Sequence, residues 1–157
     1  MRRLVVLILA SMLVFLTSCN NFREIKVNNA KLENVSPYGM RGVDLELSVQ
    51  IDNPALQIKI TDMEATIKYS GKVLGNVTVD PFTMKGKRVE EYDVKARMIL
   101  DQGVMLYDLL MLLDKKFTEN CLVDITVTGK LRGGLSKTIT RKDVPLKKLM
   151  KYAEKNK

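Results

Sequence analysis

Hydrophobic and polar residues alternate along much of this chain with the period of two that is typical of half-buried β-strands. The clearest run is residues 43–52, where every odd-numbered position is Val, Leu or Ile and every even-numbered position is polar. The same analysis predicts seven strands, at residues 25–35, 42–52, 63–69, 73–79, 92–100, 121–131 and 135–144.

Turn signals separate these predicted strands. The strand over residues 42–52 runs into Asn53-Pro54, where Pro lacks the N–H that a strand ladder needs and the Asn side chain can cap a turn. Gly71 and the pair Gly133-Gly134 stand where the chain reverses between neighbouring strands. Because most consecutive strands are joined by short loops, we expect a mainly β fold, a seven-stranded antiparallel β-sandwich of the immunoglobulin or fibronectin III type.

Two segments have the pattern of helices. Residues 104–113 are apolar nearly all round, which predicts a helix that is buried against the sheets or against a partner. The second predicted helix begins at Pro145, because Pro is well suited to the first helical position, and one side of it is rich in Lys.

The N-terminal segment has the pattern of an export signal. Two Arg residues precede an apolar run from Leu4 to Leu16, which at about 1.5 Å per residue is shorter than the roughly 30 Å hydrocarbon core of a bilayer. The residues that close it, Leu16-Thr17-Ser18-Cys19, resemble the lipobox of bacterial lipoproteins. This resemblance implies cleavage before Cys19 and attachment of lipid to its thiol, and an ordinary secretory signal is the alternative.

These expectations divide the chain into a lipoprotein signal peptide (1–18), a lipid anchor with a short tether (19–24), a β-sandwich (25–144) and a basic C-terminal helix (145–157). Asn20 follows the predicted anchor. In the Gram-negative sorting pattern that this segment resembles, Asn at that place favours the outer membrane. We therefore expect a domain in the bacterial cell envelope, lipid-anchored at the outer membrane and facing the periplasm.

The strand that ends at Asn53-Pro54 and the hairpin that follows at residues 67–75 resemble the late embryogenesis abundant type 2 family, also called the water stress and hypersensitive response domain. The resemblance covers roughly residues 25–144. It implies a seven-stranded sandwich with a helix, no enzymatic site, and an association with desiccation or stress protection. For Asn53 and Pro54 it implies a structural turn. Many members carry a second Asn after the Pro, and because Ala55 stands here, no role for that Asn is transferred.

Composition narrows the possible chemistry. The 157 residues contain no His, which excludes His-based catalytic triads, His metal sites and imidazole acid–base catalysis. Once Cys19 is acylated, Cys121 is the remaining thiol, and its phase in the predicted strand indicates a buried core side chain. Ser70 and Ser136 each have a Lys nearby in sequence, and adjacent strand residues face opposite sides, which excludes direct contact between Ser136 and Lys137 on one face. We therefore expect no enzyme, no metal site and no cofactor.

Charge is concentrated near the C-terminus. The chain carries a net +8, and residues 130–157 contain ten Lys or Arg against two acidic residues. One interpretation is a solvated helix beside a charged edge strand. The other is a docking face for anionic lipid or an acidic protein partner, formed by Lys147, Lys148, Lys151 and Lys155. Nucleic acid is not an expected partner, because the chain is predicted to be exported.

The sequence thus predicts a membrane-anchored, non-enzymatic lipoprotein of the cell envelope that acts as a binding or stress-protective module. Two alternatives remain open. One is a periplasmic carrier or holdase for apolar ligands, in which the helix over residues 104–113 covers an apolar groove. The other is a structural subunit of an envelope complex, in which the same helix is an interface.

Overall fold

Eight β-strands make up most of residues 25–105 and 119–148, which are the residues that this computed structural model describes. In chain order they are β1 (Lys26–Tyr38), β2 (Gly42–Asn53), β3 (Ile58–Tyr69), β4 (Lys72–Val79), β5 (Phe82–Met84), β6 (Arg88–Leu100), β7 (Cys121–Leu131) and β8 (Ser136–Pro145). All seven predicted strands are present. The short strand β5 is an addition that the alternation of residues did not reveal.

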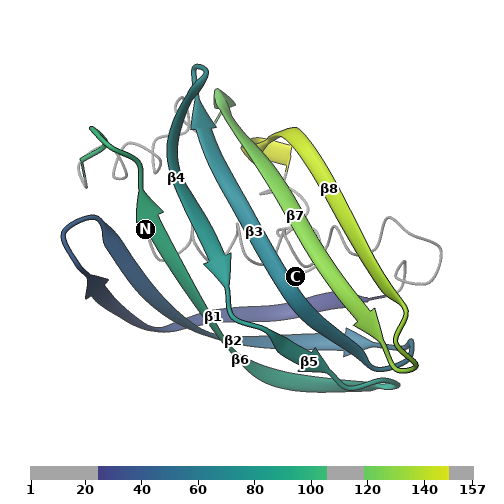
Figure 1. Ribbon diagram of the computed structural model, residues 1–157. Helices are drawn as coiled ribbons and strands as arrows, with labels where there is room; N and C mark the ends of the chain where they lie inside the picture. The colour runs from purple at the N-terminus through teal and green to yellow at the C-terminus, as the bar shows by residue number, and fades with distance from the viewer. Residues whose placement is uncertain (1–24, 106–118, 149–157) are drawn as a thin grey trace.

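The strands form one antiparallel sheet with the order β1-β2-β6-β4-β3-β7-β8, and β5 pairs with β3 beside this path (Figure 1). Every pairing is antiparallel. The predicted fold class, a mainly β antiparallel structure, is therefore confirmed. The hairpin between β3 and β4 turns through Ser70 and Gly71, whose φ angles of 48° and 80° are typical of a type I′ turn.

Strand β4 holds the two halves of the sheet together at one end only. Residues Gly75–Val79 of β4 pair with the second half of β6, whereas the first half of β6 pairs only with β2. Beyond Pro81 the chain continues as β5, which stays with β3. Figure 1 shows the result, with β1, β2 and the start of β6 lying across the direction of β3, β7 and β8.

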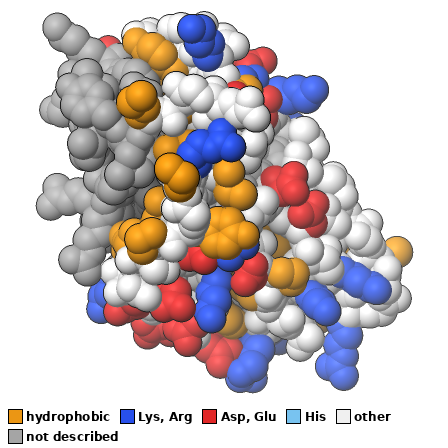
Figure 2. Space-filling model, turned by 60° about the vertical axis from the view of Figure 1, so that its left-hand side comes forward, with side chains coloured by type: hydrophobic (Ala, Val, Ile, Leu, Met, Phe, Trp, Pro, Cys, Tyr) orange, Lys and Arg blue, Asp and Glu red, His pale blue; other side chains and the backbone are white. Residues whose placement is uncertain are grey.

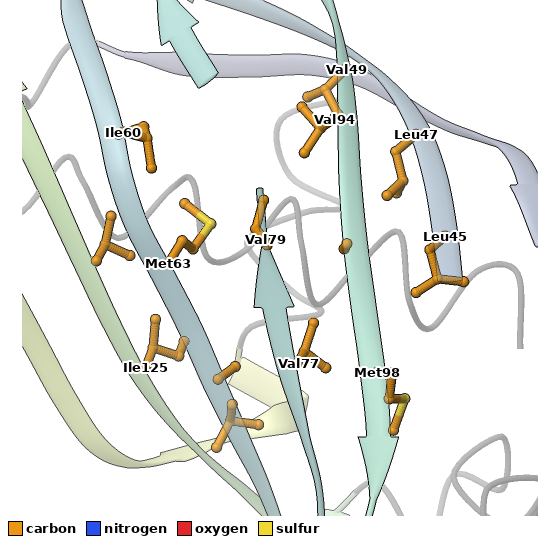
Figure 3. Close-up of a cluster of buried hydrophobic side chains, with 14 of the residues drawn as sticks. Leu45, Leu47, Val49, Ile60, Met63, Val77, Val79, Val94, Met98 and Ile125 are labelled. Carbon is orange, nitrogen blue, oxygen red and sulfur yellow. The ribbon is translucent and has the colours of Figure 1, made fainter. Parts of the chain in front are cut away.

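The core lies between these two halves of the bent sheet. Figure 3 shows side chains from β2 and β6, such as Leu47 and Val94, in one cluster with Met63 of β3 and Ile125 of β7. Leu47 and Met63 are each 1% exposed. The alternating pattern of the sequence thus places one face of each central strand in a single core, because side chains in a strand alternate between faces.

The two outermost strands differ in how much they bury. β1 places Val27 and Leu32 in the core, while no side chain of β8 is fully buried. Cross-strand hydroxyl pairs join β8 to β7, with Thr128 and Thr138 Oγ1 atoms 2.9 Å apart. Figure 2 shows another part of the surface, where hydrophobic side chains run down the middle of the view and Lys and Arg side chains are scattered from its top to its lower right.

Two helix predictions reach the described residues only at their first positions. Val104 and Met105 are not helical, and the Val104 N–H donates to the Asp101 carbonyl at 3.2 Å in a turn after β6, so the start predicted for the first helix is wrong. Its remaining residues, 106–113, lie outside the described residues. Pro145 is the last residue of β8, opposite Leu122, and helical structure begins one residue later, at Leu146, which is fully buried.

Candidate functional site

Asn53 organises the turn after β2 from a fully buried position. Its side-chain Nδ2 donates to the carbonyls of Leu56 and Lys85, at 3.1 and 3.2 Å, and its Oδ1 accepts the N–H of Ala55 at 3.1 Å. The exposed fraction of Asn53 is 0%. Both N–H donors and the carbonyl oxygen of this amide are therefore used in closing the turn at residues 54–57 and joining it to the chain after β5, which is a structural use of the side chain.

The segment that Asn53 contacts approaches the turn closely. The Lys87 N–H donates to the Ala55 carbonyl at 3.0 Å, and a Cβ at Gly86 would lie 2.7 Å from the same oxygen. Tyr92 adds a further link, because its hydroxyl accepts the N–H of Lys85 at 2.9 Å. These contacts fix the turns after β2 and β5 relative to each other.

The same turns belong to one end of the sheet, which gathers four separate segments of the chain. Lys26 at the start of β1 pairs with Asp52, and Asn53 pairs with Arg88. Through the neighbouring strands, Lys59 of β3 pairs with Lys130 of β7. We call this the basic end and define it as residues 26, 52–59, 85–90 and 130–137, at the lower right of Figure 1.

Positive charge dominates the basic end. Its segments contain eight Lys or Arg and two acidic residues, a net charge of +6. Lys85 is paired with Glu90, 2.8 Å between Nζ and Oε1, and this hydrogen bond holds the pKa of the Glu90 carboxyl below its ordinary value. The other seven cations are exposed and form no ion pair among the described residues: Lys26, Lys59, Lys87, Arg88, Lys130, Arg132 and Lys137.

Two of these cations lie directly opposite each other. Lys59 and Lys130 occupy paired positions on β3 and β7, and Gly129, the neighbour of Lys130, is paired with Lys137. Like charges at directly opposed positions destabilise a sheet. The arrangement is therefore a cost to the folded state that an anion outside the sheet would reduce.

Exposed apolar side chains project among the cations of the basic end. Leu56 lies in the turn after β2 and is 61% exposed, and Leu135, in the hairpin between β7 and β8, is 74% exposed. Val89, at the start of β6, is also largely exposed. Turns that carry Leu between Lys and Arg present an amphipathic surface rather than a uniformly charged one.

The predicted docking lysines lie elsewhere. Lys147 and Lys148 follow β8 at the other end of the sheet, and both are exposed. Lys147 forms an ion pair with Glu119, whose pKa lies below its ordinary value because of that hydrogen bond. Cys19, Lys151 and Lys155 lie outside the described residues. The predicted face of four lysines stays a prediction, and one of its two described members is already paired.

At the other edge of the sheet, the hairpin between β1 and β2 lies next to a second charge cluster. Arg97 donates from Nε and Nη2 to the two carboxylate oxygens of Asp44, at 2.6 and 3.0 Å, and the hydrogen bond lowers the pKa of Asp44. The guanidinium carbon also lies 3.5 Å from the centroid of the Tyr38 ring, in a cation–π contact. At this end of the sheet, Arg97 is therefore both neutralised by Asp44 and stacked on Tyr38.

Reactive groups are sparse in the described part of the chain. Cys121 is fully buried, as its strand phase predicts, and burial raises the pKa of its thiol to about 11, so thiolate is scarce at neutral pH. Residues 25–105 and 119–148 contain no group of three His, Cys, Asp or Glu side chains that could hold a metal ion. Within the same ranges, no helix is long and apolar enough to cross a membrane.

Sequence reasoning found part of the basic end and missed the rest. Lys130, Arg132 and Lys137 belong to the C-terminal charge excess, but Lys59 and Lys87 come from regions of balanced charge. Only the strand pairing brings these segments together. Lys59 and Lys87 lie in predicted loops, between the strands at 42–52 and 63–69 and between those at 73–79 and 92–100, so no local pattern identified them.

Comparison with known families now gives the class of the protein. The family model of the late embryogenesis abundant type 2 proteins (LEA_2) matches residues 46–149, so this chain belongs to that family. The match includes the turn at Asn53 and most of the sheet. The family resemblance noted in the sequence is thereby confirmed.

Solved structures offer distant similarities. A protein from Archaeoglobus fulgidus is similar over 74% of this chain and 93% of its own, with 13% identity and a TM-score of 0.45. The β-glucuronidase of Bacteroides uniformis is similar over 73% of this chain and 12% of its own, with 14% identity and a TM-score of 0.29. These similarities carry no argument about activity. No curated protein matches the sequence.

Proposed function

We propose that this LEA_2 protein is a non-enzymatic lipoprotein of the bacterial cell envelope, held at the membrane by lipid on Cys19 and acting there as a binding or stress-protective module. The family match over residues 46–149 supports the module. The sequence Leu16-Thr17-Ser18-Cys19 supports the anchor. The absence of His from the chain and the burial of Cys121 favour a non-enzymatic role.

The observation that carries the proposal is the short distance in sequence between the anchor and the fold. Ile25 is buried and β1 begins at Lys26, so five residues, 20–24, separate the acylated Cys19 from the first buried residue of the fold. The chain from Cys19 to Ile25 reaches at most about 20 Å. Two or three acyl chains on one Cys give stable attachment, whereas one chain gives only marginal attachment. The domain is thereby kept next to the bilayer.

Two Cys variants test this proposal, one as the test and the other as its control. Cys19→Ala removes the acylation site, and metabolic labelling with radioactive palmitate should then give no labelled protein. Cys121→Ala is the matched control, because it removes the other Cys of the chain and should leave labelling unchanged. Equal labelling of wild type and Cys19→Ala would contradict the proposal. The carrier and envelope-subunit alternatives stay predictions, since residues 106–113 lie outside the described residues.

A further inference from the structure

We infer that the basic end is a docking surface for the anionic headgroups of the bilayer that holds the anchor. This inference rests on the proposed function, because it takes the bilayer near Cys19 as given. It identifies which face of the domain meets the lipid. The face differs from the one that the C-terminal lysines predicted.

The place where the chain enters the fold supports this orientation. Lys26 begins β1 and pairs with Asp52, so the tether reaches the domain at the basic end. β7 has eleven residues from Cys121 to Leu131, which at about 3.3 Å per residue separates the two ends by about 33 Å. The chain from Cys19 to Ile25, with its five intervening residues, reaches at most about 20 Å. The basic end is therefore the end that the tether holds nearest to the lipid.

Charge complementarity identifies the occupant as an anionic surface. Seven exposed cations at this end lack ion pairs among the described residues, and Lys59 and Lys130 repel each other across neighbouring strands. Contact with anionic headgroups would neutralise this repulsion. Screening limits such attraction to about 10 Å at ordinary salt. In this orientation, cations at the other end of the domain are therefore too far from the leaflet to be attracted by it.

The exposed leucines suit a lipid surface better than a purely polar anion. Leu56 and Leu135 project from the turns of the basic end, between Lys and Arg residues that are adjacent in sequence or in space. Apolar side chains at loop tips can enter the boundary between headgroups and acyl chains while the cations around them stay among the headgroups. The same surface would gain little from leucines if its partner were a free anion.

Distance from the bilayer can be measured at both ends of the domain. A thiol-reactive fluorophore is placed by Leu135→Cys at the basic end or by Met40→Cys at the opposite end, where both native side chains are largely exposed. Cys121 is buried and its thiol pKa is about 11, which protects it from labelling. The lipidated full-length protein is reconstituted into phosphatidylcholine vesicles with or without phosphatidylglycerol, and lipids carrying a quencher in the headgroup report proximity.

We expect the Leu135 probe to be quenched at least about twice as strongly as the Met40 probe in vesicles with phosphatidylglycerol, because the opposite end lies about a strand length, about 33 Å, farther from the headgroups that carry the quencher. High salt should reduce this contrast without any mutation. The triple variant Lys59→Gln, Lys87→Gln, Arg132→Gln should reduce it as well. The matched triple variant Lys72→Gln, Lys147→Gln, Lys148→Gln should leave it unchanged.

Flotation of the vesicles separates the two possible failures. Protein that floats with equal quenching at both positions, or with stronger quenching at Met40, overturns the docking surface and leaves the anchor intact. A contrast that does not depend on anionic lipid also overturns it. Protein that fails to float overturns the proposed anchor together with the inference that rests on it.

Discussion

The two ends of the sheet are built from the same kinds of strands and turns, but they differ in net charge and in how many of their cations form ion pairs. The basic end has a net charge of +6 over its four segments, and seven of its cations lack ion pairs within the described residues. The opposite end, residues 38–44, 69–72, 97–105, 119–121 and 143–148, has five basic and four acidic residues, a net +1. There Arg97 is paired with Asp44 and Lys147 with Glu119.

The difference indicates which end of the sheet has cations available for an external anion. Surface ion pairs contribute little to stability, so pairing alone does not explain why one end has it. At an end that faces only water, acidic side chains can form ion pairs with the basic ones. An end that meets an anionic leaflet uses unpaired cations, at the cost of repulsion such as that between Lys59 and Lys130.

The largest expected effect concerns the turn that shapes the basic end. Asn53→Ala leaves the carbonyls of Leu56 and Lys85 and the N–H of Ala55 without their side-chain partner. We expect the free energy of unfolding to fall by about 3 kcal/mol in urea titrations, since unsatisfied buried polar groups are costly.

A control and a local measurement sharpen this prediction. Asn34→Ala removes an exposed side chain whose hydrogen bond to Glu46 is 3.4 Å long, and it should change stability by at most about 0.5 kcal/mol. Amide hydrogen exchange in Asn53→Ala should increase at residues 55–57 while the hairpin at residues 69–72 keeps its protection. A loss below about 1 kcal/mol would show that the turn does not depend on the buried amide.

We expect a smaller loss of stability at the opposite end, when the cation–π contact of Arg97 is removed. Tyr38→Ala removes the ring under the Arg97 guanidinium and should lower the free energy of unfolding by about 1 kcal/mol, as expected for a cation–π contact at a partly exposed site. Tyr38→Phe keeps the ring and should lose less than half of that amount. Equal losses in the two variants would assign the effect to the Tyr38 hydroxyl instead.

A smaller change should stabilise the fold while weakening the docking surface. Lys59→Glu places a carboxylate opposite Lys130, which replaces a repulsion across β3 and β7 with an attraction. We expect thermal unfolding to show a gain of about 0.5 kcal/mol, and quenching of the Leu135 probe to decrease. Lys72 is paired with Tyr69, so Lys72→Glu is the matched control and should give no gain in stability. A destabilised Lys59→Glu would contradict the account of repulsion at the basic end.

The smallest effect is a titration at the opposite end. Lys147 lowers the pKa of Glu119 through their hydrogen bond, so the stabilisation from this pair is present above the ordinary carboxyl pKa and is lost as pH falls through the lowered one. In Lys147→Gln, NMR titration should show the pKa of Glu119 moving up towards its ordinary value. Lys148→Gln is the control that should leave it in place. An unmoved pKa in Lys147→Gln would show that the pair does not form in solution.

Much of the fold could be predicted from the sequence because alternation in the central strands is uninterrupted. The positions that alternate in β2 and β7, such as Leu47 and Ile125, are the ones that the core buries. Strand β5 has three residues, too few for a pattern to register, and its pairing with β3 depends on contacts between distant segments. The role of β4 in joining the two halves of the sheet could not be predicted for the same reason, because it depends on pairing between distant segments.

The candidate site was predictable only in part. A run of charge along the sequence identified the C-terminal lysines, but it could not show that Lys147 lies beside Glu119. Nor could it show that Lys87 and Arg132 share an end, since their separation in sequence is large and register decides their placement. A charged surface that several turns form together depends on the topology of the strands and not on any local sequence motif.

The most direct test of the account is mass spectrometry of the native protein purified from membranes. The account predicts a mature chain that begins at Cys19 and carries diacylglycerol on the thiol, with or without a further acyl chain on its amino group. A chain in which residues 1–18 remain attached, or in which Cys19 carries no lipid, would contradict it.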